Sequence, residues 1–250
     1  MTVEFSWLRS QLYKECLQEY PQARAMDLEI MKTFLDPQLQ DTILEIGAWS
    51  GFFSGKIADA CKQLYVSDPS KEQLEAVQKL NRKNISFVLW GAENFDIPEK
   101  SVDSIWSFLA FHHCFNKTKA FANFQKALKP WGKLVIVDVL SGSSLAKHFD
   151  DKVSKYSITG HEVSFLTEEY FSSLCFGTDR KDANVVVLED VQRRFESEED
   201  IWKYLYKLHA MTKTTPEECL KSAKDILWIE KIDSGYGLNR PLAVFQAIKE

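Results

Sequence analysis

The sequence lacks the long apolar runs of a membrane protein and the leader of an exported one. Its most apolar stretches, residues 105–111 and 134–140, are strand-sized, whereas a membrane-spanning helix needs ~18 consecutive apolar residues. The N-terminal sequence MTVEF contains no basic segment followed by an apolar one, so a secretory signal is not expected. We therefore expect a cytoplasmic protein that has no membrane partner.

Paired cysteines and an excess of basic residues are also lacking. The five cysteines lie far apart and form no Cys-x-x-Cys motif, which predicts reduced thiols and neither a disulfide framework nor a metal site. The formal net charge is −5, whereas broad nucleic-acid binding depends on a basic surface that neutralises phosphates. A nucleic-acid partner is therefore not expected, although this charge leaves room for a local basic groove.

Short apolar runs alternate with helix-length segments between residues 40 and 140. The runs predicted as strands are 42–47, 63–67, 85–89, 102–111 and 133–139. Apolar strands separated by helices indicate a parallel sheet that is covered on both faces. The sequence thus predicts an α/β fold of the Rossmann-like, doubly wound, mostly parallel type.

The flanking segments predict additions to this core within a single domain of residues 1–250. The predicted parts are an N-terminal helical cap over 1–37, a cofactor-binding core over 40–140, and a lid, a helical insertion and the last strands over 141–250. The cap is helical from Phe5 and ends at Asp36-Pro37. The Ser-, Gly- and charge-rich residues 141–166 predict a loop or lid, and helices are expected from 197 to about 232, before a last strand over 242–248.

A glycine turn and an acid follow the first two predicted strands. Gly47 and Gly51 precede a helix, where glycine lets the backbone approach a ligand and the helix N-terminus favours negative charge. Asp68 ends the second strand, 21 residues after Gly47, which is the spacing at which a carboxylate meets a ribose diol in doubly wound folds. A dinucleotide fingerprint would need glycine at positions 49 and 52 as well, but Trp49 and Phe52 stand there. The pattern predicts a nucleoside site and disfavours a nicotinamide enzyme.

Several short motifs together resemble the class I S-adenosylmethionine-dependent methyltransferases, most closely the small-molecule branch of the type 11 kind. The matching residues are Glu45, Gly47 and Gly51, then Asp68-Pro69-Ser70, Ala92–Pro98, Val102-Asp103, Phe111-His112-His113 and Ala127–Leu134. Each motif alone is weak, but their shared order and spacing over residues 40–140 is specific. The resemblance implies a seven-stranded sheet, S-adenosylmethionine as cofactor and methyl transfer as the activity.

The same resemblance implies which residues contact the cofactor. Asp68 is expected to bind the ribose, and Glu45 to lie near the cofactor's amino group. Glu93 is expected near the adenine, and the backbone around Phe108 and Leu109 is expected to line the methionine end. The expected set is Glu45, Gly47, Trp49, Gly51, Asp68, Pro69, Ala92, Glu93, Phe108 and Leu109.

The sequence departs from the family pattern at two positions. Trp49 replaces the middle glycine of the first motif, and Gly91 stands where many relatives place an aspartate that binds the adenine. Two interpretations follow for Trp49. Either the indole turns away from the ligand, or the cofactor site is altered.

A dedicated catalytic base is not required, because the sulfonium of the cofactor is already activated. If a base exists, His113 is the first choice and His161 the second, since imidazole titrates near neutral pH. His112 and His113 are adjacent, so on an extended chain their side chains are expected to point to opposite sides. A metal site shared by these two residues is therefore not expected.

The expected acceptor is a small molecule that is apolar or aromatic, because the chain is acidic and its C-terminal part is rich in aromatic residues. Trp202, Tyr206 and Trp228 are the predicted walls of its pocket. Two other functions are kept open at this point. One is a cofactor-binding regulatory relative that does not methylate, and the other is a methyltransferase acting on RNA or protein.

Overall fold

The computed structural model describes residues 7–178 and 180–250, which form two compact units. The first, here called the sheet unit, comprises residues 30–138, 163–186 and 243–250. The second, the insertion unit, comprises 139–162, 187–242 and the N-terminal residues up to 29. Among the described residues, no helix is long and apolar enough to cross a membrane. That the whole chain is one domain stays a prediction.

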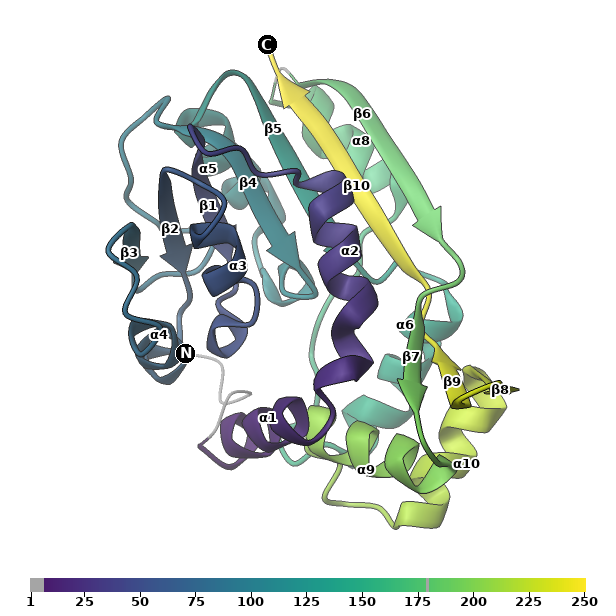
Figure 1. Cartoon of the computed structure of the whole chain (residues 1–250). Coiled ribbons are helices and arrows are strands. Elements are labelled where there is room, and N and C mark those ends of the chain that lie inside the picture. Colours follow the sequence, from purple (N-terminus) through teal and green to yellow (C-terminus); the bar gives the residue numbers. More distant parts are fainter. Residues whose placement is uncertain (1–6, 179) are drawn as a thin grey trace. The chain divides into compact units, whose positions relative to one another are not determined.

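The sheet unit is built on seven strands. They are β1 (Thr42–Ile46), β2 (Gln63–Ser67), β3 (Ile85–Val88), β4 (Val102–Phe108), β5 (Leu128–Asp138), β6 (Arg180–Leu188) and β10 (Leu242–Lys249). Figure 1 shows them in the order β3-β2-β1-β4-β5-β10-β6. The strands β1 to β5 pair with one another in parallel, and β10 is antiparallel to β5. The predicted seven-stranded, mostly parallel sheet is confirmed.

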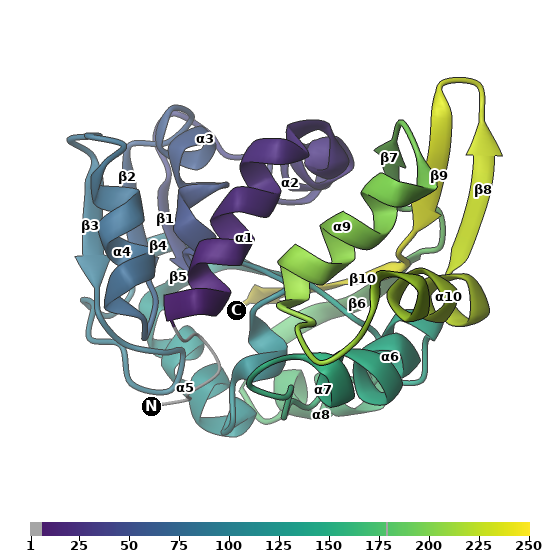
Figure 2. The ribbon, with the colours of Figure 1, turned by 90° about the horizontal axis from the view of Figure 1, so that it is seen from below.

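Helices cover both faces of this sheet, so the central strands are buried on both sides. The helices are α3 (Ser54–Ala58), α4 (Lys71–Gln78), α5 (Lys117–Ala127) and α8 (Glu168–Phe176). Figure 2 shows α5 and α8 on one face and α3 on the other. Ser70 caps the start of α4 and Thr167 caps the start of α8. In each case the side-chain oxygen accepts a backbone N–H of the first helical turn.

Two elements of the sheet unit differ from their predicted bounds. The strand predicted from residue 133 begins at Leu128, and its pairing with β4 shifts from Val102↔Leu128 to Ser104↔Lys133, so the residues between form a bulge. The helix predicted from Phe52 begins only at Ser54. A 3₁₀ turn over Trp49–Gly51 precedes it, and Ser50 in that turn has the non-helical φ of 56°.

The insertion unit contains helices and a second, three-stranded sheet. The helices are α1 (Trp7–Glu19), α6 (Ser144–His148), α7 (Ser154–Tyr156), α9 (Glu198–His209) and α10 (Pro216–Ile226), together with the start of α2 (Ala25–Phe34). The strands are β7 (Gln192–Phe195), β8 (Trp228–Ile232) and β9 (Gly235–Asn239), in the antiparallel order β7-β9-β8. Figure 2 shows the β8–β9 hairpin with β7 beside it. The predicted N-terminal helices are confirmed from Trp7 on, while Phe5 lies outside the described residues.

Two predictions for the insertion unit are wrong. The expected loop over 141–166 contains α6, a π turn over Phe149–Val153 and α7. Polar residues hid these short helices, although Ser143 supplies an N-cap for α6. The helical stretch expected to reach residue 232 ends at Ile226, because 228–232 pair with β9 as a strand. Trp228, on the edge of that sheet, is 67% exposed, so it does not wall a closed pocket.

Candidate functional site

The ends of β1, β2, β4 and β5 meet at one edge of the sheet, because neighbouring parallel strands share their carboxyl edge. The N–H of Gly47, after β1, donates to the carbonyl oxygen of Ser67 at the end of β2 (2.8 Å). Gly47 has a φ of +89°, and a Cβ on it would lie 2.4 Å from the Cβ of Ala110, after β4. Glycine is therefore required for this close approach of two strand ends.

Trp49 lies in the same turn in a left-handed conformation, with a φ of 42°. Such a φ is strained for a bulky residue and free for glycine, which agrees with the glycine that the resembled motif places here. The indole folds back over the turn: its Nε1 lies 3.3 Å from the position that a Cβ on Gly47 would take. Its ring centroid lies 6.2 Å from that of His113. How the indole affects cofactor affinity stays a prediction.

Gly51 closes the turn with a φ of +85° and faces α4. A Cβ on it would lie 3.1 Å from Cδ1 of Leu80 and 3.5 Å from Cα of Val77. The side of Gly51 that a larger residue would fill is therefore already occupied by the packing between this turn and α4. A contact between its backbone and the cofactor stays a prediction.

Replacing Gly51 with valine is expected to lower the free energy of unfolding by roughly 2–5 kcal/mol, because a left-handed residue with a Cβ costs ~1–2 kcal/mol and overpacking ~1–3 kcal/mol. Gly142→Val is the matched control, since Gly142 has a φ of +81° and nothing within 4 Å of its Cβ position. Denaturant unfolding should show the larger loss for Gly51→Val. Equal losses, with cofactor binding abolished only by Gly51→Val, would assign Gly51 to ligand contact instead.

Asp68 fixes two backbone segments at the end of β2. Its Oδ2 accepts the N–H of Ala48 (2.8 Å), and its Oδ1 accepts the N–H of Ser70 across Pro69 (2.8 Å). Burial raises the pKa of Asp68 to about 6, although both hydrogen bonds act to lower it. Each carboxylate oxygen has a second lone pair. The carboxylate can therefore hold the turn and still accept hydroxyl groups from a ligand.

Glu45 is buried inside the sheet, on β1, with one oxygen unpaired. Its Oε2 accepts the hydroxyl of Ser54 (2.5 Å), while its Oε1 has no hydrogen-bond partner among the described residues. Burial raises the pKa of Glu45 to about 8; the Ser54 hydrogen bond lowers it and the charge of Asp68 raises it. A buried unpaired acceptor is costly. Glu45 therefore fits a ligand that brings a cationic N–H donor.

The free energy of unfolding is expected to fall by roughly 1.4 kcal/mol per pH unit between pH 6.5 and 8 because of Glu45. The folded protein keeps this proton up to about pH 8, whereas the unfolded chain releases it near the usual glutamate pKa of 4.5. The folded state thus binds more protons in this window, and stability decreases as the pH rises. Glu45→Gln should flatten the slope in denaturant titrations, whereas the exposed Glu99→Gln should not. A slope unchanged in Glu45→Gln would refute the raised pKa.

The residues expected near the adenine have structural partners in this fold. Oε1 of Glu93 accepts the N–H of Phe115 (2.8 Å) and of Asn116 (3.1 Å), before α5. The buried Ala92 accepts a hydrogen bond on its carbonyl oxygen from Asn123 Nδ2 (3.2 Å). Glu93 therefore orders the loop before α5, and its contact with adenine stays a prediction.

Phe108 and Leu109, at the end of β4, are the residues whose backbone is expected to line the methionine end of the cofactor. The Phe108 ring is buried and packs on Phe53, with 4.8 Å between ring centroids. Leu109 has a φ of 50°, and its N–H donates to the carbonyl oxygen of Val137 (2.7 Å). That the backbone here lines the methionine end of the cofactor stays a prediction.

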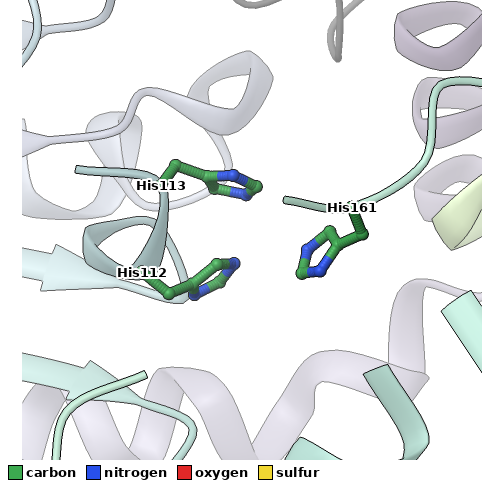
Figure 3. A group of neighbouring side chains, drawn as sticks. All are labelled: His112, His113 and His161. Atoms are coloured by element: carbon green, nitrogen blue, oxygen red, sulfur yellow. The ribbon is translucent and has the colours of Figure 1, made fainter. Parts of the chain in front are cut away.

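The expectation that His112 and His113 point to opposite sides is wrong. Both lie in a 3₁₀ turn (Phe111–His113) rather than on extended chain. Their ring centroids are 4.2 Å apart, and Figure 3 shows the two rings projecting the same way. The alternation of side chains holds only for strands, and β4 ends at Phe108, before the two histidines.

An acid at the end of β5 orients His112. Asp138 accepts the His112 backbone N–H on Oδ2 (2.9 Å), and its Oδ1 lies 2.6 Å from His112 Nδ1. Both side chains are 3% exposed. Sequence reasoning missed this pair and favoured His113. The signal was present, because Asp138 is the one charged residue in the otherwise apolar end of that strand, and it lies at the carboxyl edge.

His161, the second expected base, belongs to the insertion unit. Its ring is buried and stacks on Phe149, with 4.7 Å between centroids and 27° between planes. Its catalytic role stays a prediction.

Comparison with known proteins decides the family. The chain is 33% identical over 151 residues to an uncharacterized methyltransferase of Geobacillus kaustophilus, a match that covers 58% of this chain and 68% of that protein. This chain belongs to the class I S-adenosylmethionine-dependent methyltransferases. A family model described as "Methyltransferase domain" matches residues 44–136 of this chain. A Bacillus cereus methyltransferase is 29% identical over 136 residues, 53% of this methyltransferase and 63% of that protein.

Solved structures share the fold of this methyltransferase. Phosphoethanolamine N-methyltransferase 2 of Haemonchus contortus, in complex with S-adenosyl-L-methionine, aligns with a TM-score of 0.68 and 18% identity, over 99% of this chain and 59% of that one. A Bacillus subtilis protein aligns with a TM-score of 0.62 and 16% identity, over 89% and 97%. The protein is thus an enzyme that uses S-adenosylmethionine, and the fold class predicted from the sequence is confirmed.

Proposed function

We propose that the cofactor binds at the carboxyl ends of β1 and β2 and that the methyl group goes to a small acceptor with an apolar or aromatic body. The observation that carries the cofactor site is the buried, unpaired Oε1 of Glu45, two residues before the left-handed Gly47. An ammonium group would donate to this oxygen, and a ribose diol would donate to Asp68. When bound, the cofactor supplies a methyl group on an already activated sulfonium.

His112 is the base that the geometry of the sheet unit favours for an O–H or N–H acceptor. Asp138 Oδ1 accepts from Nδ1 of His112, which selects the tautomer with a lone pair on Nε2. Nε2 would take the proton that the acceptor loses as its oxygen or nitrogen bonds to the methyl group. His113, favoured from the sequence, and His161 remain the alternatives to be compared with it.

The nature of the acceptor is inferred from the insertion unit and from charge. Trp202 and Tyr206 on α9 are partly exposed and pack edge to face, with 6.4 Å between centroids. The net charge of −5 disfavours a polyanionic acceptor such as RNA. The strained Trp49 over the glycine turn is the observation that favours the regulatory alternative, in which the cofactor binds but no methyl group is transferred.

The test separates these functions in two steps. Calorimetry with S-adenosylmethionine and S-adenosylhomocysteine measures binding, and mass spectrometry then follows a labelled methyl group into phenols, aromatic amines and aromatic acids. We expect binding and transfer to at least one small aromatic compound. Binding without transfer to any of them, or transfer only to RNA or protein, would overturn the proposed acceptor. Failure to bind would overturn the site.

A further inference from the structure

The insertion unit buries several basic side chains around one buried carboxylate among its described residues. The buried basic residues are Arg9, Arg24, Arg193, Arg240, His148, His161 and His209, and the carboxylate is that of Asp27. Burying charge without a partner costs several kcal/mol per ion. Those members of this cluster whose polar atoms have no partner would therefore gain from an anion.

Asp27 is already shared between two of these arginines. Its Oδ2 accepts from Nε of Arg24 (2.7 Å), and its Oδ1 forms an ion pair with Arg193. Arg24 also donates to the hydroxyl of Tyr13 (2.8 Å). Among the described residues, one buried carboxylate thus faces two guanidinium groups.

Arg240 adds a third guanidinium on the same face of the small sheet. Arg193 pairs with Leu238 across β7 and β9, and the N–H of Arg240 donates to the carbonyl oxygen of Val191 (3.0 Å). Positions two residues apart on paired strands lie on one face. Arg193 and Arg240 are therefore diagonal neighbours there, with exposures of 1% and 2%.

Several side-chain nitrogens of this cluster have no hydrogen-bond partner among the described residues. They are Nε and Nη1 of Arg193, Nε of Arg240, both ring nitrogens of His148 and Nε2 of His209. The rings of His148 and His209 lie 6.5 Å apart. Burial, together with the charges of Arg240 and Lys152, lowers the pKa of His148 to about 3. The surroundings are thus positive as well as buried.

We propose that Arg193 and Arg240 bind one anionic group, a carboxylate or a phosphate monoester. Guanidinium groups match both anions through paired N–H donors. His148 and His209, neutral at pH 7 because their pKa values are lowered, would add hydrogen bonds. The anion site lies in the insertion unit alone and does not depend on the identity of the methyl acceptor.

Thermal unfolding of the cofactor-free full chain tests this, with three aromatic probes at constant ionic strength. Benzoate and phenyl phosphate carry the two candidate anions, and benzyl alcohol is the neutral control. A ligand that binds only the folded state raises the melting temperature in proportion to the logarithm of its concentration above Kd. We expect such a rise with benzoate or phenyl phosphate, which also distinguishes the two anions. No rise with either, or an equal rise with benzyl alcohol, overturns the proposal.

Two arginine variants place the anion within the cluster. Arg240→Met should weaken binding of the anion that raises the melting temperature at least tenfold. Arg194→Met removes the same charge from an exposed neighbour of Arg193 and should leave anion affinity unchanged. Without a probe, Arg240→Met should melt no lower than wild type, because the unpaired buried charge is gone. An unchanged anion affinity in Arg240→Met refutes the assignment.

Discussion

Replacing His112 with asparagine is expected to lower kcat by a factor of roughly 10²–10⁴, the range that a positioned general base contributes. The asparagine amide can still donate to Oδ1 of Asp138, which lies 2.6 Å from Nδ1 of His112. It has no group at the position of Nε2 to accept a proton. KM for the cofactor should change little, because Glu45 and Asp68 are untouched. Steady-state kinetics with the acceptor that the methyl-transfer assay identifies would measure both parameters.

His113→Asn is the matched control, because it removes the adjacent ring, 4.2 Å away, and leaves the pair of His112 with Asp138 intact. Asp138→Asn tests the positioning role. It should lower kcat, since the carboxylate no longer selects the tautomer of His112, but less than His112→Asn does. A larger loss in His113→Asn than in His112→Asn would return the role to the residue favoured from the sequence.

The sheet could be predicted because its strands carry their own signal. KLVIVDV and its neighbours are apolar on both faces, and this pattern fits only a covered parallel sheet. The helices over 144–156 could not be read, because Ser143, Asp150 and Asp151 are equally common in loops. The β8–β9 hairpin was hidden for another reason. Residues 228–232 lie directly after an amphipathic helix, and only the two-residue turn Asp233-Ser234 separates the two strands.

The candidate site was predictable along the chain but not across it. Gly47 and Asp68 could be found because spacing along one strand–helix–strand unit places them, and Glu45 because it matches the motif of the resembled family. The pair of His112 with Asp138 depends on the contact of β4 with β5 and on a 3₁₀ turn that ends the alternation of side chains. The shared Asp27 of the arginine cluster likewise joins residues 166 positions apart. Such contacts follow from topology, which local patterns do not contain.

Asp68→Ala is expected to weaken S-adenosylmethionine binding at least tenfold, and by about 10²–10⁴-fold if both ribose hydrogen bonds are lost. Hydrogen bonds to a charged group contribute ~1.5–3 kcal/mol each, and a ribose diol would donate two. The variant also releases the N–H groups of Ala48 and Ser70, so the turn loses its order before the ligand arrives. Calorimetry at pH 7.5 would measure the loss. In the wild type, affinity should fall as the pH drops below about 6, where Asp68 takes up a proton.

Asp103→Ala is the control that separates ligand contact from turn stability. Asp103 lies at the amino end of β4, and its Oδ2 accepts the N–H of Thr42 (2.8 Å) at the start of β1. Like Asp68, it accepts a backbone N–H between two strands, but at the opposite edge of the sheet. Asp103→Ala should lower the melting temperature and leave cofactor affinity unchanged, whereas Asp68→Ala should lower both. If the two variants lost the same stability and neither lost affinity, Asp68 would be a structural carboxylate, and the cofactor would have to bind through the Gly47 turn and Glu45 alone.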